Sequence, residues 1–232
     1  MRAKAPAAPW VRRGKAGLIH RKIGEDGIWR SLRAQRASGA PRPALFLDRD
    51  GTVIEEVPYL SRPEEVRPIP EAVETIVRAN ALGIPVVVVS NQSGIARGLF
   101  DWSAFAAVEA AIDSAVAQAG GHIDAVYACP HAPPGPGKPS PPDRKPDPGM
   151  LLRAAKDLNL DLKASWVAGD RASDLEAGRS AGLCRGWLAP TGYGRREANA
   201  ARALANDSFE VVVGKSLGAL ASELEALRAN GG

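Results

Sequence analysis

The amino-acid sequence predicts an α/β protein with a parallel sheet that is covered by helices on both faces. Short apolar segments, typical of buried strands, alternate along the chain with longer segments whose apolar residues recur at helical spacing. One strand segment, residues 84–90, contains four consecutive valines, which is typical of a strand covered on both faces. In such sheets ligands bind beyond the carboxyl ends of the strands, so residues at those ends are the first candidates for function.

Strands are expected wherever a short apolar run is bounded by residues that break regular structure. In chain order they cover residues 45–47, 84–90, 123–129, 165–170, 185–188 and 209–213. Because helical segments separate most of them, the strands are expected to pair in parallel and to be joined by crossover connections.

Helices are expected where apolar residues recur every three or four positions between start and stop signals. They cover residues 70–82, 102–118, a segment that opens at residues 147–148, 173–182 and 217–227. Pro70 suits the first turn of the first helix, and Gly83 ends it. Ser173 and Glu176 have the spacing of a capping box. Residues 130–146 are rich in proline and are expected to form a long loop.

Residues 1–43 are expected to be an extension that precedes one domain, residues 44–232. The extension carries eleven Lys or Arg and two acidic residues, a net charge of +9, whereas the remainder carries −5 of the total of +4. Residues 1–16 are expected to be disordered, a turn signal at residues 24–27 indicates a small hairpin, and residues 34–43 form a linker. A basic arm suits an anionic partner such as nucleic acid, or more commonly a solvated extension.

The composition excludes several classes of protein. No apolar run is long enough to span a membrane, and no secretory apolar region follows the start. Cys129 and Cys184 are too few for a disulfide scaffold, so the reducing cytoplasm is the simplest location. The first twenty residues are rich in arginine, as in an organelle transit peptide, but they lack its serine enrichment.

Three expected strands end in polar residues. Asp48 and Asp50 follow the first, Ser90 ends the second and Asp170 ends the fourth. In a parallel sheet these ends lie on one edge, so the three carboxylates converge and would repel one another if unpaired. Mg²⁺, a hard cation that prefers oxygen ligands, would resolve this repulsion. Lys145, at the entrance to a helix, adds a second positive charge.

These groups are the parts that phosphoryl transfer needs. A cation and a lysine neutralise phosphate oxygens. One carboxylate attacks phosphorus to form an aspartyl-phosphate, and a second, two residues on, protonates the leaving oxygen and later activates water. Taken alone, Asp48 and Asp50 are better explained as the caps of a turn, but together with the other motifs they favour catalysis.

Four strings in this order, DRDGTV, SNQSG, RKPDPGM and GDRASD, resemble the four motifs of the haloacid dehalogenase-like (HAD) phosphohydrolases. The fuller strings FLDRDGTV, SNQSGIARG and RKPDPGM are similar to the branch (subfamily IIIA) that contains the heptose bisphosphate phosphatases and the histidinol-phosphatases. The resemblance covers residues 44–190. It implies a Rossmannoid three-layer fold and a Mg²⁺-dependent phosphatase.

The resemblance also implies a role for each motif residue. Asp48 would be the nucleophile and Asp50 the general acid and base. The side chains of Asp48 and Asp170, with the backbone carbonyl of Asp50, would hold Mg²⁺. Ser90 and Lys145 would hold the phosphoryl group. Substrate contacts are implied for Asn91, Gln92, Ser93, Arg144, Arg171 and Tyr59.

Many members of this branch carry a structural zinc, held by Cys-x-His and by Cys-x-Cys directly before Arg-Lys-Pro. This chain has Cys129 and His131, but it has Pro-Pro-Asp before Arg144, so neither later cysteine is present. Asp143 is the one further ligand that the loop offers. Three ligands do not complete a tetrahedral site, so a structural zinc is not expected.

The spacing of the motifs leaves no room for a cap domain. Only 42 residues separate Asp48 from Ser90, and a helix, a strand and a loop fill the interval to Lys145. By analogy with the family, this is a capless member with an open site.

The leading expectation is a monomer that hydrolyses a small sugar bisphosphate, the heptose bisphosphate by resemblance. Histidinol phosphate or another small ester is the alternative within the class. A polynucleotide 3′-phosphatase and a non-catalytic scaffold are alternatives of other classes. The −5 charge of the body argues against nucleic acid, and the presence of Asp48 argues against a scaffold.

Overall fold

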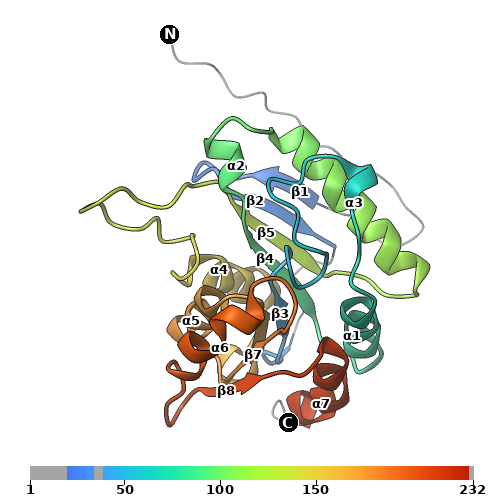
Figure 1. Cartoon of the computed structure of the whole chain (residues 1–232). Coiled ribbons are helices and arrows are strands. Elements are labelled where there is room, and N and C mark those ends of the chain that lie inside the picture. The colour runs from blue at the N-terminus through green and yellow to red at the C-terminus, as the bar shows by residue number, and fades with distance from the viewer. Residues whose placement is uncertain (1–19, 34–38, 230–232) are drawn as a thin grey trace.

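The computed structural model describes residues 20–33 and 39–229, whose strands form one eight-stranded sheet (Figure 1). The strands are β1 (His20–Ile23), β2 (Trp29–Leu32), β3 (Leu45–Leu47), β4 (Val86–Asn91), β5 (Ala125–Cys129), β6 (Trp166–Gly169), β7 (Arg185–Leu188) and β8 (Glu210–Val213). The α-helices are α1 (Pro70–Ala81), α2 (Ser93–Ala96), α3 (Trp102–Gln118), α4 (Gly149–Leu158), α5 (Ala172–Ala181), α6 (Gly194–Arg202) and α7 (Leu217–Ala229). Two short 3₁₀ helices, η1 (Pro63–Glu65) and η2 (Leu162–Ala164), complete the described elements.

The strand order places β3 at the centre of the functional edge. The order is β1-β2-β5-β4-β3-β6-β7-β8, and all pairs from β5 to β8 are parallel. Leu47, the last residue of β3, is in register with Val88 of β4 and Ala168 of β6. The residues that follow these three strands therefore meet at one edge of the sheet.

Two apolar layers cover the sheet (Figure 1). α1, α3 and α7 pack on one face, and α4, α5 and α6 pack on the other. Alternation along each strand divides the side chains between the layers, so Leu45 and Leu47 belong to the first layer and Phe46 to the second. Burial of each such side chain contributes about 1.5–3 kcal/mol relative to exposure, which anchors the short β3 firmly.

The predicted fold class is confirmed, and all six expected strands are present. No separate cap domain lies between β3 and α4, a stretch that the structure describes completely. α6 was not expected, because its residues are mostly polar and only Gly194 and Ala201 are buried. The predicted capping box was wrong. α5 begins at Ala172, and Asp174 accepts the hydrogen bond from the Arg171 N–H.

β1 and β2 form an antiparallel hairpin, and β2 also pairs antiparallel with β5. Residues 20–33 therefore extend the main sheet. The division of the chain at residue 43 stays a prediction, and the disorder expected for residues 1–16 concerns residues outside those described. Within the described part of the chain, no helix combines the length and apolarity that a bilayer crossing requires.

Candidate active site

A cleft with a cavity volume of about 740 Å³ opens at the carboxyl ends of β3, β4 and β6. This volume suits a small molecule. Ten of the eleven predicted site residues line it: Asp48, Asp50, Tyr59, Ser90, Asn91, Gln92, Ser93, Arg144, Lys145 and Arg171. The eleventh, Asp170, is fully buried behind the cleft. The structure therefore brings the four motifs together around one cavity.

The turn after β3 brings the first and last motifs together. The Asp48 N–H donates to the Ala168 carbonyl at 2.9 Å, so the sheet ladder holds the start of the turn. Gly51 has φ +80°, and a Cβ at this position would lie 2.4 Å from Oδ2 of Asp170. The Thr191 hydroxyl donates to the Gly51 carbonyl at 2.6 Å. Only glycine lets the chain pass this close to the buried Asp170.

Lys145 is buried between two carboxylates. Its Nζ lies 2.6 Å from Oδ1 of Asp48, 2.7 Å from Oδ1 of Asp174 and 2.8 Å from the Val89 carbonyl. Desolvation works to lower the pKa of Lys145, but Asp174 and Asp48 outweigh it, so the pKa is raised above its ordinary value. The Asn91 amide accepts from the Lys145 N–H at 3.1 Å and donates to the Lys145 carbonyl at 3.0 Å, which fixes the backbone of the loop.

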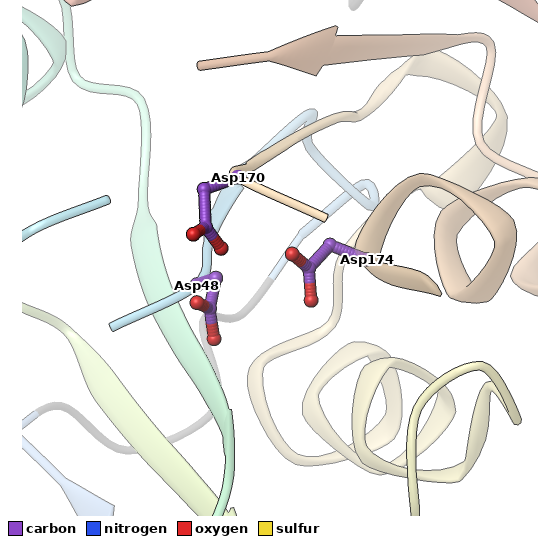
Figure 2. Close-up of side chains that lie close together, drawn as sticks. All are labelled: Asp48, Asp170 and Asp174. Carbon is purple, nitrogen blue, oxygen red and sulfur yellow. The ribbon is translucent and has the colours of Figure 1, made fainter. Parts of the chain in front are cut away.

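Three buried aspartates converge at this point (Figure 2), and Lys145 contacts two of them. Asp48, Asp170 and Asp174 each offer an oxygen within 4.8 Å of the others. Both oxygens of Asp174 are engaged, one by Lys145 and one by the Arg171 N–H at 3.0 Å. Asp174 therefore acts first as the partner that holds Lys145 beside Asp48.

Asp170 has an oxygen that suits a cation. Its Oδ2 accepts from the Tyr193 N–H at 2.8 Å, whereas its buried Oδ1 has no hydrogen-bond partner among the described residues. Burial raises the pKa of Asp170 to about 7. Burial also raises the pKa of Asp48 well above its ordinary value, Lys145 opposes the rise, and Asp174 adds to it. An oxygen-binding divalent cation between Asp48 and Asp170 fits this donor set.

The predicted metal set and the observed cluster differ in one member. The predicted set is Asp48, Asp50 and Asp170, and the cluster contains Asp174 in place of Asp50. Asp50 is predicted to bind the metal through its backbone carbonyl, and this role stays a prediction. The proximity of Asp174 to Asp48 follows from its contact with Lys145.

The Asp50 side chain is held by donors from three neighbours. Gln92 donates to its Oδ2 at 2.8 Å, and the Ser90 hydroxyl lies 3.5 Å from the same oxygen. Arg49 donates from Nη2 to Oδ1 at 2.8 Å and from Nε to both oxygens at 3.1 Å. Gln92 also donates to Ser90 at 2.7 Å. The second motif therefore orients the second carboxylate of the first motif.

Sequence reasoning missed Arg49 and its partner Glu109. Arg49 is 1% exposed, and its Nη1 donates to Oε1 of Glu109 at 3.0 Å. Burial raises the pKa of Glu109 to about 7, and Arg49 opposes this rise. One signal was available in the sequence. Glu109 falls on the apolar face of α3 with Phe105, Val108 and Ile112, and an acid on such a face requires a buried partner.

The outer wall of the cleft carries two arginines. The Arg171 guanidinium lies 3.7 Å from the ring centroid of Tyr193, a residue that sequence reasoning also missed. Arg144 is half-buried and donates to the His131 carbonyl at 2.7 Å. Tyr59 is 47% exposed at the rim. Two cations thus face a cleft whose floor already carries Lys145.

The proline-rich loop of residues 130–146 is tied to its surroundings by ion pairs. Arg153 contacts both oxygens of Asp143, at 2.6 and 2.9 Å, and also contacts Asp26 of the β1–β2 turn at 2.9 Å. Cys129 Sγ lies 3.4 Å from Nδ1 of His131, and burial raises the pKa of this thiol to about 11. Asp143, the third ligand considered, is thus engaged elsewhere, and the zinc expectation stays a prediction.

This fold and this constellation define a HAD-like hydrolase. A family model described as HAD-hydrolase-like matches residues 143–213. The D-glycero-beta-D-manno-heptose-1,7-bisphosphate 7-phosphatase of Mesorhizobium japonicum is 46% identical over 177 residues, which cover 75% of this chain and 81% of that protein.

Two solved structures are also similar. A HAD-like phosphatase from Mesorhizobium loti is 39% identical with a TM-score of 0.73, and the match covers 90% of this chain and 96% of that one. The D,D-heptose 1,7-bisphosphate phosphatase of B. bronchiseptica, complexed with magnesium and phosphate, is 34% identical with a TM-score of 0.69, over 79% of this chain and 98% of that one. The chain belongs to the HAD-like phosphatases, in the family of the heptose-1,7-bisphosphate 7-phosphatases.

Proposed function

We propose that the protein is a Mg²⁺-dependent phosphomonoester hydrolase that removes the 7-phosphate of D-glycero-beta-D-manno-heptose 1,7-bisphosphate. One observation carries the proposal. The Asp48 carboxylate lies against Lys145 and close to Asp170, whose Oδ1 has no hydrogen-bond partner among the described residues, at the end of a central strand and on the floor of a cleft. The name of the 46% identical relative supports this substrate and this anomer.

Asp48 and Asp170, with the Asp50 carbonyl, would hold the cation, which neutralises charge on the phosphate oxygens when bound. Lys145 and Ser90 bind the other phosphate oxygens. An oxygen of Asp48 attacks phosphorus as the bond to the C7 oxygen breaks, and Asp50 gives that oxygen its proton. Asp50 then takes a proton from water. The water oxygen attacks the aspartyl-phosphate, which releases phosphate and restores Asp48.

The charges of the cleft favour a substrate with two phosphates. One phosphate at Asp48 uses Lys145 and the cation, so it leaves Arg144 and Arg171 for a second anionic group. Histidinol phosphate carries an ammonium group at its other end, which two arginines would repel. Asn91, Gln92, Ser93 and Tyr59 line the same cleft and are proposed to contact the sugar.

We also propose that the enzyme works in the cytoplasm as a monomer. Cys129 and Cys184 are both free thiols, which suits a reducing compartment.

The test is phosphate release, with Mg²⁺ and with EDTA, from a panel of phosphate esters. The panel holds both anomers of the heptose bisphosphate, histidinol phosphate, common sugar phosphates and a 3′-phosphorylated oligonucleotide. We expect Mg²⁺-dependent turnover of the beta anomer at a kcat/KM at least about tenfold above every other member. Preference for the oligonucleotide or for histidinol phosphate would replace the proposed substrate. Turnover that EDTA leaves unchanged would contradict the cation site.

Cation binding is expected to depend on pH. A carboxyl with a raised pKa binds protons in the folded state that the unfolded chain has released, so the contribution of Asp170 to the stability of the metal-free protein falls as pH rises from about 4 through 7. Mg²⁺ must displace these protons. A fixed Mg²⁺ concentration that saturates the site at pH 8 should therefore raise the Tm by about 5–10 °C at pH 8 and much less at pH 5.5.

Differential scanning fluorimetry at the two pH values measures this difference. Asp170→Asn serves as the control, because it removes one group with a raised pKa and one ligand of the proposed cation. An equal rise in Tm at both pH values would contradict the assignment of Asp170 as a ligand.

A further inference from the structure

Arg49, the residue between the two aspartates of the first motif, forms a buried ion pair with Glu109, which is distant in sequence. We infer that Glu109 is a positioning residue for Asp50 and acts on it through the buried Arg49. The inference rests on the proposed function, in which Asp50 is the general acid for the leaving oxygen. Nothing in the four motifs points to Glu109, which lies sixty residues beyond Arg49 on α3.

Arg49 sets the orientation of the Asp50 carboxylate. Its Nη2 and Nε donate to Oδ1 at 2.8 and 3.1 Å, and Nε also donates to Oδ2 at 3.1 Å. The Arg49 side chain is 1% exposed, whereas that of Asp50 is 20% exposed and lines the cleft. A planar guanidinium imposes direction as well as charge on the carboxylate that it binds. The geometry of Asp50 thus depends on where this plane lies.

Glu109 and Phe105 fix that plane from the helix side. Oε1 of Glu109 accepts from Nη1 of Arg49 at 3.0 Å, and the guanidinium carbon lies 5.2 Å from the centroid of the Phe105 ring. Glu109 is 5% exposed and Phe105 is fully buried, so both contacts are shielded from water. The guanidinium is therefore held by one edge and one face, and its other edge is presented to Asp50.

A simpler role for Glu109 is to neutralise a buried arginine and so stabilise the fold. Loss of one partner from a buried ion pair is costly in either case, so reduced stability does not separate the two roles. They differ in what happens to the chemistry. A residue that places the general acid should matter for a poor leaving group and not for a good one, because an acidic phenol departs without a proton.

The experiment compares kcat/KM for an alkyl phosphate and for 4-nitrophenyl phosphate in Glu109→Gln. The heptose bisphosphate serves as the alkyl ester. Since kcat/KM covers the steps through departure of the leaving group, it excludes the later hydrolysis of the aspartyl-phosphate. We expect Glu109→Gln to lower kcat/KM about tenfold for the alkyl ester and less than about twofold for the aryl ester. Asp50→Asn should show the same preference with a larger loss.

Glu74→Gln, an exposed acid on α1, is the control for loss of one charge and should leave both rates unchanged. Equal losses on both esters, or no loss on either, would overturn the inference. If Glu109→Gln does not fold, Glu109→Asp replaces it, because this variant keeps the charge and moves it away from Arg49 by one methylene. The criterion is again a larger loss of kcat/KM for the alkyl ester than for the aryl ester. Wild-type protein that hydrolyses neither ester would contradict the proposed function itself, and that result is distinct from any outcome for Glu109.

Discussion

Asp48→Asn should abolish phosphate release, with a fall in kcat of at least about 10⁴-fold. An amide cannot attack phosphorus as a carboxylate does, and each of the three neighbouring aspartates is engaged or buried. Asp174 is engaged by Lys145 and the Arg171 N–H, Asp170 is fully buried, and Asp50 is held by Arg49 and Gln92. Steady-state phosphate release from the preferred ester, at saturating Mg²⁺, measures the effect.

The same variant should not unfold the protein. Burial and the neighbouring carboxylates raise the pKa of Asp48, which means that they disfavour its charge, so a neutral amide relieves repulsion in the metal-free protein. We therefore expect the Tm without Mg²⁺ to be equal to or above that of the wild type. Near-wild-type turnover by Asp48→Asn would overturn the assignment of the nucleophile.

Lys145→Met should reduce both activity and stability. Lys145 lies within 2.7 Å of two buried carboxylates and is itself 4% exposed, so its loss leaves Asp48 and Asp174 uncompensated. Removal of one partner from a buried ion pair costs about 3–5 kcal/mol. The phosphate would also lose the lysine on the floor of the cleft, so we expect kcat/KM to fall by about 10²–10³-fold. Denaturant unfolding and steady-state kinetics measure the two effects.

A double variant separates the two consequences. In Lys145→Met with Asp174→Asn, one of the two uncompensated charges is gone, so at least half of the lost stability should return. Activity should stay as low as in Lys145→Met, because the cation that faces the phosphate is still missing. Recovery of activity together with stability would mean that Lys145 serves the fold and not the phosphate.

The sequence alone determined the parallel part of the sheet and the place of the site. The valine run of β4 and the apolar residues of β3 predict buried parallel strands, because alternation with helices and the length of the connections allow few other arrangements. Parallel strands expose their carboxyl ends on one edge, and so the convergence of Asp48, Ser90 and Asp170 could be deduced from their positions after strands. The roles of these residues stay predictions until the variants are measured.

Local patterns were weaker guides where polar residues dominate. α6 has few apolar residues at helical spacing, and it forms because it packs against α5 and the sheet. The predicted start of α5 was wrong because Ser173 and Glu176 have the spacing of a capping box. In the structure the Asp174 side chain caps the helix by accepting a hydrogen bond from the Arg171 N–H. The first residue of a helix depends on the backbone conformation of the residues that lead into it. The spacing of Ser173 and Glu176 does not specify that conformation.

Only the tertiary structure decided which buried charges meet. Arg49 pairs with Glu109, Asp170 accepts from the Tyr193 N–H, and Arg153 ties Asp143 to the β1–β2 turn, all across large separations in sequence. A buried charge needs an oppositely charged or polar partner within contact distance. Which side chain is within that distance depends on how the helices pack on the sheet. The sequence thus determined the atoms that can perform the chemistry, and the packing decided which residues hold them in position.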